Sequence, residues 1–134
     1  MAFKYSRQRE IIRSFMQGRI DHPTADVVYM NVKKEIPNIS LGTVYRNLML
    51  LASNGELAKV EVGDGTVHFD PVTDDHSHFF CETCGAVSDL FLPCEESFGE
   101  AVSKALPGAI ISHRQITFRG VCPSCVGASK PVTA

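Results

Sequence analysis

The sequence predicts an α+β protein whose N-terminal half is mostly helical and whose C-terminal half mixes strands with a helix. Three helix-like apolar stripes and two β-prone segments fill residues 6–69. Strand signals near residues 77–81, 86–92 and 110–121 surround one helix signal near 95–105, in which we expect Phe98 and Val102 to point inward. Two C-x-x-C motifs stand at 81–84 and 122–125. We therefore expect domains at residues 1–70 and 71–126, and a disordered tail at 127–134.

The first two predicted helices have clear start and stop signals. Ser6 can cap the first helix, and Gly18 can end it. Its expected buried stripe is Ile11, Ile12, Phe15 and Met16. Thr24 can cap the second helix, which we expect to run until Pro37 stops it. Its apolar residues recur four apart, as Val28, Val32 and Ile36.

The third predicted helix begins after Ser40 and ends at Gly55. Its apolar face consists of Leu41, Val44, Leu48 and Leu51. Its other faces then carry Gly42, Thr43, Tyr45, Arg46 and Asn47. Two β-prone segments follow, at residues 57–62 and 66–69, around the turn signal Gly-Asp-Gly. The order of these elements is typical of a winged helix-turn-helix domain, in which the third helix enters the major groove of DNA.

Charge favours the N-terminal half for any contact with phosphate. The net charge of the chain is only −2, but the first 20 residues hold five basic side chains and one acidic one. The candidate contacts with DNA are Ser40, Thr43, Tyr45, Arg46 and Arg13. Helix-turn-helix patterns also occur in domains that touch no DNA, so the pattern alone leaves that function open.

The two C-x-x-C motifs predict a closed structural zinc site. Two such turns can surround one Zn²⁺ with four sulfurs, here those of Cys81, Cys84, Cys122 and Cys125. The alternatives are a redox dithiol or two disulfides in a secreted domain. The polar, basic start MAFKYSRQRE lacks a signal-peptide core, so we expect a cytoplasmic protein with reduced thiols. Cys94 lies outside both pairs and receives no role.

The overall composition agrees with an ordinary globular protein that does not enter a membrane. The chain is 44% hydrophobic and 21% charged. No apolar run approaches the roughly 20 residues that a membrane-spanning helix needs.

Four segments together carry a family resemblance. They are HPTADVVY (22–29), NISLGTVYRNL (38–48), His-Ser-His (76–78) running into CETCG (81–85), and GVCPSC (120–125). They resemble the ferric uptake regulator family of metal-dependent repressors, over roughly residues 6–125. The resemblance implies a homodimer that binds a double-stranded DNA operator, each subunit having an N-terminal winged helix and a C-terminal α/β dimerisation domain.

The resemblance also implies a regulatory site for Fe²⁺ or Mn²⁺. The peroxide-responsive members of the family use three histidines and two aspartates, which match His22, Asp70, His76, His78 and Asp89 here. Ferric-uptake members more often have Glu at the position of Asp89. Mixed nitrogen and oxygen donors suit Fe²⁺ or Mn²⁺ better than a sulfur cluster does. Each residue alone has an ordinary explanation, such as a loop histidine or a strand cap, and only their joint occurrence favours a site.

Other family features are weaker here. A further site would use Glu96 and His113, but Asp75 and Ser77 stand where His and Asp are usual. We expect that site to be weak or absent, and His68 to be a surface residue. The rival functions are an iron- or other metal-uptake repressor of the same family and, more distantly, a zinc hydrolase or a thiol oxidoreductase. We expect no enzyme, because four cysteines close the sulfur site and no H-E-x-x-H motif occurs.

Overall fold

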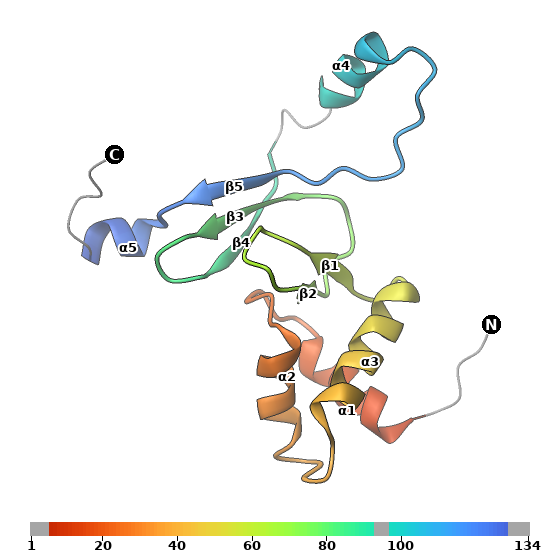
Figure 1. The fold of residues 1–134 in the computed structure, drawn as a ribbon, viewed down its shortest axis with the longest axis vertical. Helices are drawn as coiled ribbons and strands as arrows, with labels where there is room; N and C mark the ends of the chain where they lie inside the picture. The colour runs from red at the N-terminus through yellow and green to blue at the C-terminus, as the bar shows by residue number, and fades with distance from the viewer. Residues whose placement is uncertain (1–5, 93–96, 129–134) are drawn as a thin grey trace. The chain divides into compact units, whose positions relative to one another are not determined.

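The computed structural model describes residues 6–92 and 97–128, which form two compact units that divide after Thr73 (Figure 1). The first unit contains three helices, α1 (Arg7–Met16), α2 (Ala25–Val32) and α3 (Leu41–Ser53). These are followed by two short antiparallel strands, β1 (Ala58–Val60) and β2 (His68–Asp70). No helix among the described residues is long and apolar enough to cross a membrane.

Local sequence signals account for the ends of these helices. The hydroxyls of Ser6 and Ser40 accept hydrogen bonds from the amides of Arg9 (3.3 Å) and Thr43 (3.1 Å), as predicted. Thr24 stands at the N-cap of α2, but its side chain makes no capping bond. The second helix ends at Val32, earlier than predicted, and the chain passes through a turn at residues 33–35 before Pro37.

The three helices and β2 enclose one apolar core. Its buried members come from every element of this unit except β1: Ile12, Met16, Val28, Val32, Ile39, Val44, Leu48, Leu51, Leu57 and Phe69. The predicted stripes are therefore largely confirmed, with two corrections on α3. Leu41 is 42% exposed rather than inward. Asn47 is buried rather than outward, and its amide donates to the carbonyl of Thr43 (2.9 Å), which satisfies the buried polar group.

The second unit is built on a three-stranded sheet with the order β4-β3-β5. Strand β3 (Ser77–Cys81) pairs antiparallel with β4 (Val87–Leu90) and parallel with β5 (Thr117–Gly120). Figure 1 shows α4 (Ser97–Ala105) between β4 and β5 in the chain, and α5 (Pro123–Ala128) after β5.

Three predictions for this unit need correction. Helix α4 buries none of its residues: Phe98, expected inward, is 48% exposed, and Val102 is half-buried. The strand expected over 110–121 is confined to Thr117–Gly120. The predicted tail begins too early, because α5 continues to Ala128. The rest of that tail, 129–134, lies outside the described residues.

Candidate metal centres

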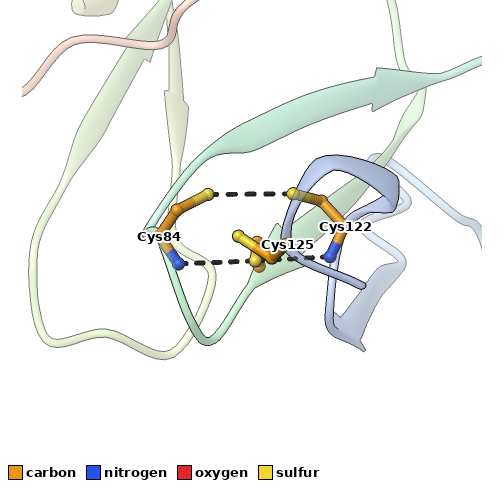
Figure 2. Close-up of side chains that lie close together, drawn as sticks. Cys84, Cys122 and Cys125 are labelled. Carbon is orange, nitrogen blue, oxygen red and sulfur yellow. Dashed lines mark hydrogen bonds between the residues drawn. The ribbon is translucent and has the colours of Figure 1, made fainter. Parts of the chain in front are cut away.

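The four paired cysteines come together at one end of the three-stranded sheet. Cys81 ends β3, Cys84 lies in the turn that leads to β4, and Cys122 and Cys125 lie before and within α5. Parallel pairing of Cys81 with Gly120 brings the second motif beside the first. Figure 2 shows the side chains of Cys84, Cys122 and Cys125 converging, and the four sulfurs lie within 4.8 Å of one another.

Hydrogen bonds and proton sharing set the thiol pKa values of this cluster in opposite directions. The amides of Cys122 (3.3 Å) and Cys84 (3.4 Å) donate to the sulfur of Cys81 and lower the pKa of its thiol to about 6. Hydrogen bonding to Cys122 and burial raise the pKa of Cys125 to about 12. Four thiolates can share this space only if a cation offsets their mutual repulsion, as a coordinated metal does.

The spacing of the sulfurs fits Zn²⁺. Tetrahedral zinc with Zn–S bonds of about 2.3 Å places its sulfurs roughly 3.8 Å apart. The sulfurs of Cys84 and Cys122 are 3.9 Å apart. Amide donors aimed at a sulfur are typical of tight turns that wrap a metal and stabilise the thiolate form. The cluster therefore suits a closed structural zinc site.

The second unit also assembles three of the predicted regulatory ligands. Antiparallel pairing places His78 of β3 opposite Asp89 of β4. His76 precedes β3 by one residue and, two positions from His78, points to the same side of the strand. One carboxylate oxygen of Asp89 lies 2.6 Å from Nε2 of His76 and 3.3 Å from Nε2 of His78. All three side chains are mostly removed from solvent, so their donor atoms form a compact nitrogen and oxygen cluster.

Outer contacts hold His76 in place. Its Nδ1 donates to the carbonyl of Asp74 (2.6 Å), which leaves Nε2 to accept or to bind a cation. Its ring also stacks on Phe91, with ring centroids 4.8 Å apart. This arrangement of a histidine fixed through one nitrogen is common among metal ligands.

The first unit supplies the other two predicted ligands as a buried pair. Nε2 of His22 lies 3.2 Å from a carboxylate oxygen of Asp70, and both side chains are at most 1% exposed. Asp70 ends β2, and His22 lies in the segment before α2 with a positive φ of 51°, which is uncommon for a residue other than glycine. A histidine and a carboxylate buried this deeply need hydrogen bonds or a charged partner. A divalent cation can bind the imidazole nitrogen and the carboxylate oxygen together.

His68 is not the surface residue that the sequence predicted. It is buried, and its two ring nitrogens contact the carbonyl of His22 (2.8 Å) and the carboxylate of Asp64 (2.7 Å). The contact with His22 spans 46 residues of chain, so no local pattern could have revealed it. All three residues of β2 are buried, so the alternation of a strand gave no signal either.

The candidate DNA-contact residues fall into two groups. Tyr45 and Arg46 are exposed on α3, where Arg46 also donates to the hydroxyl of Thr43 (3.1 Å). Arg13 instead donates two hydrogen bonds to the carboxylate of Glu56, of 2.7 and 3.1 Å, and also contacts Glu10. That pairing gives Arg13 a role within the first unit, and its contact with DNA stays a prediction.

Two further predictions concern the weak second site and the fifth cysteine. His113 is exposed in the segment between α4 and β5. Glu96 and Cys94 lie outside the described residues. The pairing of Glu96 with His113 therefore stays a prediction.

Known proteins resemble this chain across most of its length. A profile of the Ferric uptake regulator family matches residues 1–118. The peroxide operon regulator of Bacillus subtilis (strain 168) is 35% identical over 118 residues, which cover 88% of this chain and 81% of that protein. The structure of the Campylobacter jejuni peroxide stress regulator matches with a TM-score of 0.72 and 29% identity, covering 88% of each chain.

Proteins that differ more in sequence share the fold. The ferric uptake regulator from Francisella tularensis, solved with iron, matches with a TM-score of 0.80 and covers 93% of this chain and 96% of that chain. Its identity is 22%, so this likeness concerns the fold alone.

Proposed function

Because this chain belongs to the ferric uptake regulator family, we propose that it is a metal-dependent transcriptional repressor that senses hydrogen peroxide through bound Fe²⁺ or Mn²⁺. The observation that carries this proposal is the carboxylate of Asp89, which lies opposite His78 and also contacts His76. The family resemblance associates an aspartate at this position with the peroxide-responsive members. The similar proteins include a peroxide operon regulator and a peroxide stress regulator, which supports the same function. A cytoplasmic, non-enzymatic role is part of the proposal.

The two metals have different roles in this proposal. Zinc held by the four cysteines would brace one end of the sheet that carries His78 and Asp89. The regulatory ion would be held by His22 and Asp70 of the first unit together with His76, His78 and Asp89 of the second. A ligand set drawn from both units makes their relative arrangement depend on the ion, which is the differential affinity that any effector requires.

DNA binding would belong to the first unit, acting as a winged helix in residues 1–70. Helix α3 would present Thr43, Tyr45 and Arg46 to the major groove, together with its N-cap Ser40, and the β1–β2 hairpin would lie along the DNA backbone. A dimer that places two such helices about 34–36 Å apart matches successive turns of an operator. The metal must shift the population from mostly the state that cannot bind DNA to mostly the state that can. This shift needs the metal to bind the second state more tightly by about 5.5 kcal/mol.

A homodimer would form through residues 71–126. In the single chain, apolar side chains of this unit are left exposed, including Leu106 (63%), Ile110 (94%) and Phe98 (48%). These three side chains line one hollow, and monomeric proteins seldom expose large contiguous apolar patches, so an interface with a second copy would cover them.

The response to peroxide would alter a ligand and so release DNA. Fe²⁺ held by these residues would activate hydrogen peroxide beside its imidazole ligands. The oxidised histidine would give up two electrons and gain one oxygen atom, and the other peroxide oxygen would leave as water. His22 and His76 are the ligands we expect to gain oxygen. An oxidised imidazole is a poorer ligand, so the protein loses the contact that held its DNA-competent state.

Operator binding measured with Mn²⁺, with Fe²⁺, and with Fe²⁺ plus peroxide tests this function. We expect tight binding in the first two conditions and loss of binding only in the third. Loss in the presence of Mn²⁺ plus peroxide as well would point to the cysteines rather than to iron. Binding that survives peroxide but disappears when metal is removed would establish the rival, a metal-uptake repressor.

A further inference from the structure

His68 connects the turn of the hairpin to the segment that carries His22. Its Nδ1 lies 2.8 Å from the carbonyl of His22, and its Nε2 lies 2.7 Å from the carboxylate of Asp64 in the hairpin turn. Burial pulls the pKa of Asp64 upward, but hydrogen bonds from His68 and Thr66 outweigh it and leave that pKa below its ordinary value. The carbonyl of His22 can only accept, so Nδ1 of His68 donates to it.

Strand β2 holds the backbone of residues 22–24. The amide of Phe69 donates to the carbonyl of Pro23 (3.0 Å), and Thr24 forms an isolated antiparallel bridge with His68. The contact from His68 to the carbonyl of His22 extends this line of bonds by one residue. His22 has a φ of 51°, a conformation that a residue other than glycine keeps only when its surroundings enforce it. His68 contacts the carbonyl of His22, which lies in the peptide bond directly after this strained residue.

We propose that His68, anchored by Asp64, is a positioning residue for the metal ligand His22 and that it links the hairpin turn to the regulatory site. The proposal rests on the proposed function, because it takes His22 to be a ligand. Holding the carbonyl fixes the backbone from which the His22 imidazole extends. The same bond makes the metal affinity depend on the turn at Asp64, in the hairpin expected to lie along DNA.

The rival explanation is that His68 only fills space in the first unit. Its short contacts favour the positioning role, since both ring nitrogens meet oxygen atoms within 2.8 Å. Asparagine and glutamine separate the two explanations. The amide nitrogen of asparagine lies about where Nδ1 of histidine does, and that of glutamine lies about where Nε2 does.

The experiment measures the Mn²⁺ affinity of the full-length, zinc-loaded protein through the electron paramagnetic resonance signal of free Mn²⁺. The variants are His68→Asn, His68→Gln, His68→Leu and Asp64→Asn. The control is Glu61→Gln, which removes an exposed carboxylate from the same hairpin. Melting temperature without Mn²⁺ and zinc content are recorded for each protein.

We expect His68→Leu and His68→Gln to lose about tenfold or more in Mn²⁺ affinity, in the range of roughly 10–100-fold that outer partners of metal ligands contribute. His68→Asn keeps the donor to the carbonyl of His22 but loses the contact with Asp64, so it should lose less affinity than His68→Gln and about as much as Asp64→Asn. Glu61→Gln should lose none. Zinc content should be unchanged throughout. If His68→Leu does not fold, the asparagine and glutamine variants decide.

Two results would overturn the proposal. One is equal Mn²⁺ affinity in His68→Asn, His68→Gln and the wild type, with differences only in melting temperature. The other is equal affinity in Asp64→Asn and Glu61→Gln, which removes the link to the hairpin. His22→Ala separates this failure from that of the proposed function: if it binds Mn²⁺ as tightly as the wild type, His22 is no ligand.

Discussion

The cysteine cluster and the predicted histidine–aspartate ligands are distributed differently between the two units. All four cysteines belong to the second unit and meet through one strand pairing and two tight turns. The histidines and aspartates are divided, with His22 and Asp70 in the first unit and the other three in the second. A metal held within one unit stabilises that unit. The proposed regulatory ion, held by residues of both units, would also make their arrangement depend on whether it is bound.

The largest effect should come from breaking the sulfur cluster. Cys81→Ser removes the thiol that accepts amides from Cys84 and Cys122. We expect loss of zinc and loss of folded structure in residues 74–128, because the free energy of binding structural zinc is largely folding free energy. Zinc content and circular dichroism measure both, and Cys94→Ser is the control. A folded, zinc-loaded Cys81→Ser protein would show that the cluster is not a structural site.

The next effect compares one ligand from each unit. His22→Gln and His78→Gln should each weaken Mn²⁺ binding by more than the roughly 10–100-fold that an outer partner contributes, and each should abolish operator binding. Zinc should remain in both. Isothermal titration with Mn²⁺ and operator gel shifts give the measurement, with exposed His113→Gln as control. A loss in only one of the two variants would mean that the ion is held by one unit alone.

The smallest effect concerns a contact that belongs to neither metal site. Glu56→Gln weakens the paired hydrogen bonds to Arg13 that tie α1 to the chain after α3. Both side chains are about one-third exposed, so we expect a loss of about 0.5–1 kcal/mol in the free energy of unfolding at neutral pH. Both metal affinities should stay unchanged, and altered Mn²⁺ binding would contradict this separation of roles.

The pH dependence of that contact has a definite sign. Arg13 holds the pKa of Glu56 below its ordinary value of 4.5 in the folded protein. The contribution of Glu56 is therefore present above its unfolded pKa and lost as pH falls through the folded pKa. In urea unfolding, the gap between wild type and Glu56→Gln should close on acidification below about pH 4.5. A gap that widened there would contradict the assignment.

Sequence alone predicted what depends on short spacing. The C-x-x-C pairs and the His-x-His motif place their donors within a turn or along one strand, so their geometry follows from local structure. The helix caps at Ser6 and Ser40 were equally readable. The contact of His68 with His22 and that of Arg13 with Glu56 could not be predicted, because each joins residues more than 40 positions apart. The prediction that Phe98 is buried was wrong for the single chain. An apolar helix face has the same sequence pattern whether its own chain or a second copy covers it.

Mass spectrometry of the Fe²⁺-loaded protein after exposure to peroxide tests most directly whether sensing belongs to the divided site and not to the cysteines. We expect the mass of one added oxygen atom on the peptide that contains His22 or on the one that contains His76. We also expect retained zinc and four unmodified cysteines, Cys81, Cys84, Cys122 and Cys125. Oxidised cysteines with released zinc, and no oxygen on either histidine peptide, would contradict it.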